Sequence, residues 1–582
     1  MQKYLWNILL TSTVYLCCVS VAIAQEEDEK ETIGTEKVVI VKAYTPTISD
    51  AFKIKTQPKI EDSIERPQKP VQYEINSVPV ASTFTPAKGR AAAVEKAKPI
   101  KLFDNYATLG FGNFTRALAE FYSNFEISRT DAIGLYLHHN SSQGGIDDVR
   151  LDDTFYDSEI SVDYTSRQRD MSYSIDIGGS HQLYNWYSLP EPTELTDEEI
   201  RMIDPQHSYI GATVGGEVMF EEAIFRKLTA RYRYFGDTFS SVEHRAIIKP
   251  TVEIPVVDEK ILTTFSADYV GGSFEETSML PFTSQYSFLN LGISPELVIL
   301  RNNLTLNLGA TLYFSLDTEN SETKLYIVPN VTASYGLLGT NVIAFGGLTG
   351  DLRQNTYRDA VAQNPFVSPS LTLRPTNEQF DAFAGIKGNL FNGLGYNIKG
   401  GFKAAFDQNL FLHAPESENI TTREGFQYGN SFGYVYDDIT TAYGTAEISL
   451  DISKNFQLGA SGTFNAYGTD EQEEAWNLPE IEGSVSLNYQ ITEQWYLDSQ
   501  VFFIGERKDI RPRFRQNGLT FPASTVTLDS YVDVNATVGY RFNERLSFFV
   551  RGNNLTGSYE KWQFYPVQGV QVLGGATYKF DF

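Results

Sequence analysis

The chain ends in Gly575-Ala576-Thr577-Tyr578-Lys579-Phe580-Asp581-Phe582, where aromatic and polar side chains alternate up to a terminal phenylalanine. A strand that crosses a membrane as part of a barrel shows apolar groups to lipid at every second position and polar groups to the lumen between them. Tyr578, Phe580 and Phe582 would supply the lipid side. We predict that this segment closes an outer-membrane β-barrel and that the barrel-insertion machinery reads these three aromatic residues as its assembly signal.

The other end of the chain has the parts of a secretory signal peptide. Lys3 precedes an apolar stretch from Ile8 to Ile23, and Ala22-Ile23-Ala24 offers the small residues of a cleavage site. A membrane anchor is the competing interpretation, but the stretch is short for a span of about 20 apolar residues. We therefore expect residues 1–24 to be removed.

Composition excludes several kinds of protein. Both cysteines, Cys17 and Cys18, lie in the leader, so the mature chain has no disulfide, thiolate nucleophile or cysteine metal site. The net charge of −26, from 73 acidic and 47 basic residues, argues against nucleic-acid binding. The six histidines show no metal-site spacing and are expected in loops or the lumen, and no nucleophile elbow or phosphate loop occurs. We predict no enzyme, no catalytic or metal-binding residues and no cofactor.

Alternation of apolar and polar residues recurs along the chain. In the stretch from Leu304 to Phe314 the even-numbered residues are apolar. In the stretch from Ile481 to Tyr489 the odd-numbered residues would face lipid, and in the stretch from Val532 to Tyr540 the even-numbered residues would face lipid. In the stretch from Leu228 to Tyr234, Arg231 and Arg233 fall on the polar face. An arginine facing lipid at mid-membrane costs about 2–4 kcal/mol, so the register of this strand is firmly set.

These patterns predict one all-β fold, a large antiparallel transmembrane barrel over residues 101–582 with about 22 strands. A water-soluble β-sandwich also alternates, but it rarely exceeds about 250 residues. Short turns are expected at residues 541–545 and 452–455. Long loops are expected at residues 190–206, with a short helix, and at 351–377, 414–425 and 467–477.

Side chains in the loops leave some alternatives open. Asp147, Asp148, Asp152 and Asp153 form a dense carboxylate cluster, which we interpret as solvated in preference to a calcium site, because the D-x-D-x-D-G order is absent. Tyr184, Trp186 and Tyr187 suit either a membrane-interface girdle, which we favour, or stacking on a sugar ring.

The C-terminal region resembles a known family. Arg551-Gly552-Asn553-Asn554-Leu555-Thr556, then Tyr559, Tyr565-Pro566 and Gly569, and the strand from Gly574 to Phe582 are similar to the last two strands of TonB-dependent outer-membrane receptors. That family has a Y-P-x-P-G-R element here, and this chain has Gln568 and Val570 at the second proline and the arginine positions. The resemblance covers about 30 residues directly and the rest of the barrel only through its predicted number of strands.

The N-terminal segment resembles the same family in one part. The run from Glu36 to Val41 is similar to a TonB box, and the resemblance implies that Val38, Val39, Ile40 and Val41 contact a TonB-type energy transducer by strand addition. A short strand of the periplasmic segment itself is the alternative. Residues 25–100 are 76 residues rich in Pro, Lys and Glu, short for the globular plug of such receptors, so the plug is truncated or absent. This extended periplasmic or lumenal segment, infolded loops or another protein would have to close so wide a barrel.

Three functions are compatible with these features. The resemblance implies a receptor in the Gram-negative outer membrane that binds a solute at its outer loops and imports it. The alternative is a plug-less barrel serving as a structural or accessory subunit of an outer-membrane assembly or secretion complex, and a passive porin is third. Expected partners are outer-membrane lipid, the energy transducer, the insertion machinery, and a surface lipoprotein or an outer-membrane complex.

Overall fold

The computed structural model describes residues 102–582 except 192, 222, 257–258, 276–283, 392, 418–422 and 517–518. The predicted signal peptide, the segment 25–100 and the TonB-box-like residues Val38 to Val41 lie outside the described residues. None of the helices in the described part of the chain is long and apolar enough to span a membrane.

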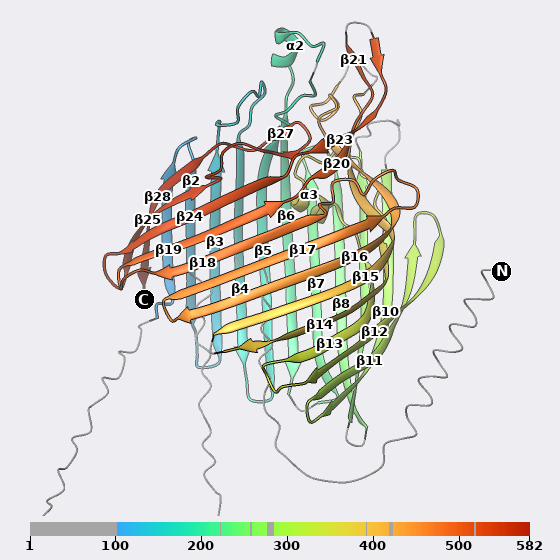
Figure 1. Ribbon diagram of the computed structural model, residues 1–582, viewed down its shortest axis with the longest axis vertical. Helices are drawn as coiled ribbons and strands as arrows, with labels where there is room; N and C mark the ends of the chain where they lie inside the picture. The colour runs from blue at the N-terminus through green and yellow to red at the C-terminus, as the bar shows by residue number, and fades with distance from the viewer. Residues whose placement is uncertain are drawn as a thin grey trace, which may run out of the picture. The chain divides into compact units, whose positions relative to one another are not determined.

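Twenty-two antiparallel strands form one closed sheet (Figure 1). Each strand pairs with its neighbours in sequence around the barrel, and β1 pairs with β28 from Asn105 opposite Phe580 to Gly112 opposite Leu573, which closes the ring. The predicted fold class and the predicted strand number are confirmed.

The barrel strands are β1 (Asn105–Gly112), β2 (Ala117–Glu126), β3 (Asp131–Ser142), β4 (Phe155–Arg167), β5 (Met171–Asn185), β6 (Gln206–Phe220), β7 (Phe225–Asp237), β8 (Val242–Val256), β9 (Glu259–Phe274), β10 (Ser284–Arg301), β11 (Leu304–Asp317), β12 (Glu322–Gly336), β13 (Ile343–Arg353), β14 (Thr376–Leu390), β15 (Leu394–His413), β16 (Phe432–Ser453), β17 (Phe456–Gly468), β18 (Ile481–Gln490), β19 (Trp495–Ile504), β24 (Tyr531–Arg541), β25 (Leu546–Asn553) and β28 (Gln571–Phe580). The connections between the barrel strands contain two helices, α2 (Asp197–Arg201) and α3 (Tyr357–Gln363). They also contain the short strands β20 (Arg507–Arg511), β21 (Phe514–Gln516), β22 (Leu519–Phe521), β23 (Ser524–Leu528), β26 (Glu560–Trp562) and β27 (Tyr565–Pro566).

The two ends of the barrel differ in the length of their connections. The end that carries the C-terminus has short turns, including the predicted turns after β24 and β16, and we call it the turn end. The opposite end, here called the mouth, carries the long connections that the sequence predicts, among them the β5–β6 connection with α2 and the β13–β14 connection with α3. In Figure 1, α2 and β21 project beyond the mouth at the top of the barrel.

The outer wall is apolar, as the alternation predicts. On β11, Leu308 is 39% exposed, whereas Thr311 and Ser315 are buried on the opposite face. Val485 on β18 and Val538 on β24 are also exposed, and Tyr232 on β7 is exposed. A continuous outward band of this kind buries its apolar surface only in lipid, so the barrel is of the membrane-spanning type.

The closing aromatic residues form a patch on this outer wall at the turn end. Tyr578 and Phe580 stack with ring centroids 5.9 Å apart, and Phe582 stacks on Phe125 of β2 at 5.2 Å. The predicted lipid side of the last strand is therefore correct in direction, while recognition of these residues by the insertion machinery stays a prediction.

Candidate functional site

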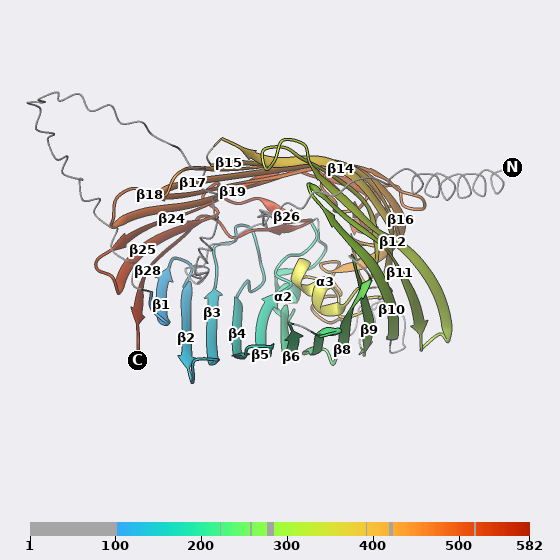
Figure 2. The ribbon, with the colours of Figure 1, turned by 90° about the horizontal axis from the view of Figure 1, so that it is seen from below.

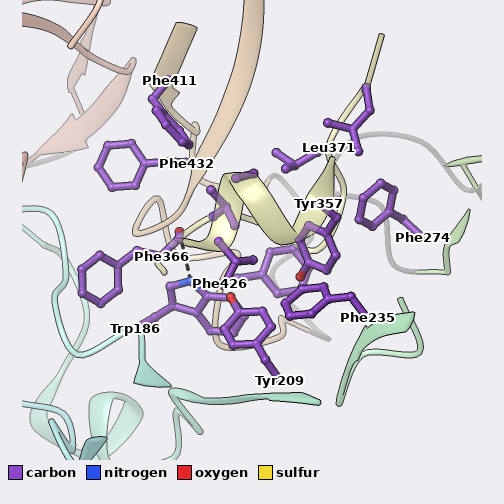
Figure 3. Close-up of a cluster of buried hydrophobic side chains, with 14 of the residues drawn as sticks. Trp186, Tyr209, Phe235, Phe274, Tyr357, Phe366, Leu371, Phe411, Phe426 and Phe432 are labelled. Carbon is purple, nitrogen blue, oxygen red and sulfur yellow. Dashed lines mark hydrogen bonds between the residues drawn. The ribbon is translucent and has the colours of Figure 1, made fainter. Parts of the chain in front are cut away.

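The connections at the mouth fold into the lumen and share an aromatic core. Figure 3 shows its centre, where residues of the β13–β14 connection meet others from the β5–β6 and β15–β16 connections and the upper barrel wall. We call this group of infolded connections the cap. Its buried core comprises Trp186, Tyr187, Tyr209, Phe235, Val270, Phe274, Tyr286, Phe288, Tyr357, Ala360, Val361, Phe366, Val367, Leu371, Leu373, Phe411, Phe426, Phe432, Trp562 and Tyr565.

Helix α3 lies inside the ring of strands (Figure 2), and two wall residues hold its first turn. Thr356 is its N-cap and accepts from the backbone N–H of Asp359 at 3.0 Å. Glu243 of β8, buried in the wall, accepts from the backbone N–H of Tyr357 at 2.6 Å and of Arg358 at 3.3 Å. Arg245 of the same strand forms an ion pair with Asp359 at 3.6 Å. The wall thus satisfies amide donors that a helix start leaves unpaired.

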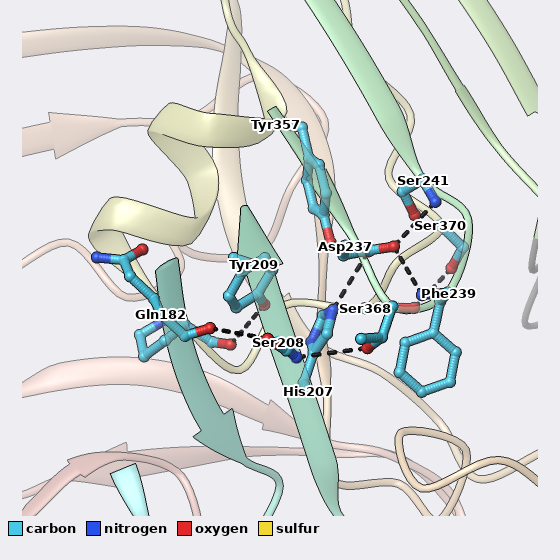
Figure 4. Close-up of polar contacts among 12 residues, drawn as sticks. Gln182, His207, Ser208, Tyr209, Asp237, Phe239, Ser241, Tyr357, Ser368 and Ser370 are labelled. Carbon is cyan, nitrogen blue, oxygen red and sulfur yellow. Dashed lines mark hydrogen bonds and ion pairs between the residues drawn. The ribbon is translucent and has the colours of Figure 1, made fainter. Parts of the chain in front are cut away.

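Tyr357 also forms a polar contact at its far end (Figure 4). Its hydroxyl donates to Asp237 at the mouth end of β7 at 2.6 Å, and burial raises the pKa of Tyr357 well above its ordinary value, so it remains a donor. Asp237 also contacts Nε2 of His207 at 3.2 Å and accepts from the backbone N–H groups of Phe239 and Ser241 at 2.9 Å. The carboxylate is therefore fully engaged, and it ties the cap to the wall.

Trp186 lies at the centre of the cap. It is 1% exposed, stacks on His207 with centroids 4.3 Å apart, and donates from Nε1 to the carbonyl of Phe366 at 3.1 Å. Tyr187 is buried against Phe366 and Tyr565. The interface-girdle interpretation is wrong for Trp186 and Tyr187, and neither ring is exposed for sugar stacking, because the two connections bury them against one another.

The Tyr565-Pro566 element, on which part of the family resemblance rests, belongs to the cap. The ring of Tyr565 stacks on Phe366 with centroids 3.8 Å apart, and its hydroxyl donates to the carbonyl of Asn430. The carbonyl of Pro566 accepts from the Tyr187 hydroxyl at 2.8 Å. The last long connection thus joins residues more than 130 positions away.

A cavity of about 380 Å³ lies between the β13–β14 connection and strands β15 to β17. The aromatic rings in its lining are those of Phe411, Tyr434, Tyr467 and Trp476. The polar groups in its lining belong to Arg353, Asn355, Asp359, Lys403, Gln408 and Asn409. Apolar walls with a few convergent polar groups are typical of small-molecule sites. We regard this cavity, with the cap beside it, as the candidate functional site.

The predicted site residues are not part of this arrangement. Tyr578, Phe580 and Phe582 lie at the turn end, on the outer wall. His207 and His413 are buried at the mouth. His244 is exposed and contacts the outward Tyr232 hydroxyl at 2.7 Å, and His181 is exposed on the same face of β5 as the outward Ile177, so the prediction that every histidine lies in a loop or the lumen is wrong for these two.

Two of the predicted loop carboxylates hold local backbone in place. Asp153 accepts from the backbone N–H of Gly144 at 2.7 Å, and Asp152 accepts from the backbone N–H of Thr154 at 3.0 Å. Among the described residues, no group of three or more His, Cys, Asp or Glu side chains is arranged to hold a metal ion.

Sequence reasoning did not identify the cap core or the cavity. Their residues come from connections far apart in the chain and carry no spacing signal. The one available signal was the unusual aromatic content of the long connections, such as Trp186, Tyr187 and Phe366.

The fold is that of outer-membrane receptor barrels. The barrel is similar to solved TonB-dependent receptors over most of its length, with low sequence identity. No protein-family model matches the sequence, and no curated protein matches it.

Three solved structures illustrate the similarity. The FpvAI–pyocin S2 complex matches at a TM-score of 0.60 with 13% identity, over 83% of this chain and 71% of that chain. The ferric-catecholate import receptor Fiu from Escherichia coli K12 matches at 0.57 with 12% identity, over 82% of each chain. The copper transporter OprC matches at 0.56 with 13% identity, over 83% of this chain and 82% of that chain.

Proposed function

We propose that this chain is an outer-membrane receptor that binds a solute at its capped mouth and imports it. The observation that carries the proposal is the cap, since side chains from four connections fill the mouth around an aromatic core and leave a mixed aromatic and polar cavity beside it. A passive porin has no use for a mouth filled in this way. A receptor needs both a closed state and a recognition surface.

The fold supports the same proposal. Structural neighbours include an import receptor for ferric catecholates and a copper transporter, and such barrels place long loops outside the cell and short turns in the periplasm. We place the mouth of this barrel outward in a Gram-negative outer membrane. The N-terminal segment would then emerge in the periplasm, where Val38 to Val41 would add a strand to an inner-membrane energy transducer.

Proline substitution tests the transport step. Proline removes the backbone donor that strand addition uses, so Val39→Pro with Ile40→Pro should abolish energised uptake. Ala92→Pro with Ala93→Pro, in the same segment but outside the TonB-box-like residues, is the matched control. Cells expressing each version would be incubated in a defined mixture of ferric enterobactin, ferric citrate, copper salts and oligosaccharides, and depletion of each solute would be followed by mass spectrometry.

We expect depletion of at least one solute by cells with the unaltered chain and by the control, and none by the Val39/Ile40 variant. Equal depletion by all three versions, or by cells lacking the protein, would refute energised import. Purification from the native membrane in mild detergent tests the accessory role: stable, stoichiometric association with several assembly or secretion proteins would favour a structural function over transport.

A further inference from the structure

Two arginines, Arg233 of the wall and Arg358 of α3, line the same part of the lumen. Arg233 of β7 faces the lumen, because its neighbour Tyr232 is exposed on the outer wall. Its cross-strand partner on β6 is Thr213, and the hydroxyl of Thr213 accepts from Nη1 of Arg358 on α3 at 3.1 Å. The guanidinium group of Arg358 on the cap helix therefore reaches the wall residue that lies opposite Arg233.

Two of the nearby carboxylates are paired with other arginines. Asp176 pairs with Arg231 at 3.0 Å, and Asp268 holds Arg245 with two hydrogen bonds of 2.9 and 2.8 Å. Within the described part of the chain, neither Arg233 nor Arg358 forms an ion pair. Arg233 also lies directly opposite Arg245 on β8, an unfavourable arrangement of like charges that the carboxylates of Asp268 and Asp359 beside Arg245 offset.

A cavity of about 200 Å³ opens at these groups. Its lining contains the guanidinium groups of Arg231, Arg233 and Arg358, the hydroxyl-bearing Ser161, Ser180 and Thr213, and the carboxylates Glu159 and Asp176. Arginines therefore outnumber carboxylates in it by one, and Asp176 is paired with Arg231. Guanidinium forks and hydroxyl donors are the groups that hold carboxylates and phosphates in proteins, and the volume fits one such group with the atoms attached to it. The chain as a whole carries a net charge of −26, so this positive cavity is not part of a generally basic surface.

We propose that this cavity is a binding site for an anionic group, a carboxylate or a phosphate, held by Arg233 and Arg358 and supported by the hydroxyls. The inference deepens the proposed function and rests on it in one respect: it gives the imported solute an anionic group. Two sources can supply the same chemistry. One is the solute, and the other is the acidic run of this chain at Glu26-Glu27-Asp28-Glu29.

Because Arg358 belongs to the cap helix and Arg233 to the wall, an anion bound between them would link the cap to the wall. Charge neutralisation at this point would strengthen the closed arrangement that Asp237 and Glu243 already hold through Tyr357. The site therefore couples occupancy of the lumen to the position of the cap.

Citrate binding to the full chain in detergent tests the proposal. Calorimetric titration would compare the unaltered chain with Arg233→Gln and Arg358→Gln, and with Arg226→Gln as the matched control, because Arg226 lies on the same strand but pairs with Glu253 near the turn end. We expect each cavity substitution to weaken citrate binding at least tenfold and the control to leave it unchanged. Arg233→Lys should restore part of the affinity, since it keeps the charge and loses the fork.

A further variant separates the two sources. Replacing Glu26, Glu27, Asp28, Glu29 and Glu31 by the corresponding amides removes the internal competitor. Tighter citrate binding by this variant than by the unaltered chain would show that the acidic run occupies the cavity, and equal binding would assign the site to an external anion. Citrate binding by neither version, or binding insensitive to Arg233→Gln and Arg358→Gln in a folded barrel, would overturn the proposal.

These outcomes are independent of the uptake experiment, because binding in detergent needs no energy transducer. Normal citrate binding with proline-insensitive uptake would refute energised import and leave the anion site intact. Proline-sensitive uptake without citrate binding would refute the anion site alone.

Discussion

The hydroxyl of Tyr357 on α3 donates to Asp237 of β7 at 2.6 Å, while the backbone N–H of the same residue donates to Glu243 of β8 at 2.6 Å. One cap residue is thus held at both ends by two carboxylates of adjacent wall strands. The contact is buried, so each hydrogen bond to a charged acceptor is expected to contribute more than an exposed one.

Tyr357→Phe should loosen the cap without unfolding the barrel. The substitution removes one donor from a buried carboxylate, which costs about 1–3 kcal/mol of local stability. Hydrogen exchange of the amides in residues 354–375 should accelerate by a factor of about 5 to 150, the equivalent of that energy. Tyr335→Phe, at an exposed position of β12, is the control. Unchanged exchange in the cap would show that the Asp237 contact does not hold it.

The mouth hairpin of β20 and β23 should lose stability as the pH rises. Burial raises the pKa of Asp509 to about 7, against an ordinary value near 4, and its Oδ1 accepts from the backbone N–H of Ile510 at 2.7 Å. Between these two pKa values the folded hairpin keeps a proton that the unfolded one loses. Stability therefore falls by about 1.4 kcal/mol per pH unit from pH 4 to 7 and is constant above.

Hydrogen-exchange protection factors of the hairpin amides, corrected for intrinsic exchange at each pH, measure this effect. Asp509→Asn keeps an acceptor and does not titrate, so its protection should be independent of pH over the same range. A native chain with protection that is flat or rises with pH would contradict the assignment to Asp509.

Arginine substitutions on the two faces of β11 should differ in cost. Leu308 is exposed on the outer wall, whereas the amide of Asn307 donates to Thr332 of β12 at 3.1 Å within the lumen. Leu308→Arg puts a charge into lipid and should cost about 2–4 kcal/mol, while Asn307→Arg remains in a wet lumen and should cost less. The free energy of unfolding from lipid vesicles in denaturant measures both. Equal costs would mean that the outward face does not contact lipid.

Polar replacement of the last two aromatic residues should lower assembly. Phe582 is 84% exposed and stacks on Phe125, so Phe580→Ser with Phe582→Ser removes outer-wall contacts and the predicted assembly signal. We expect less folded barrel in the membrane, measured as the fraction resistant to unfolding in unheated gels, with unaltered uptake per folded molecule. Phe391→Ser, at a turn where the ring is 88% exposed, is the control. Insertion at the normal level would refute the signal.

Strands β11 and β28 show most clearly what could be predicted from the sequence. From Leu304 to Phe314 the order of apolar and polar residues is sufficient to choose the lipid face, because successive side chains of a strand point to opposite sides. The aromatic residues of the last strand fixed its outward face for the same reason. The Tyr565-Pro566 element was visible in the sequence, but its stacking on Phe366 was not.

By itself, the sequence determined the class of fold, the approximate number of strands, the positions of four long connections and the lipid face of the most regular strands, since all of these follow from local periodicity and turn length. Only the tertiary structure decided that Trp186 lies in a core, that Tyr357 is held by Asp237 and Glu243, and that Arg233 and Arg358 line one cavity. These contacts join residues that are distant along the chain, and closure of the barrel brings them together.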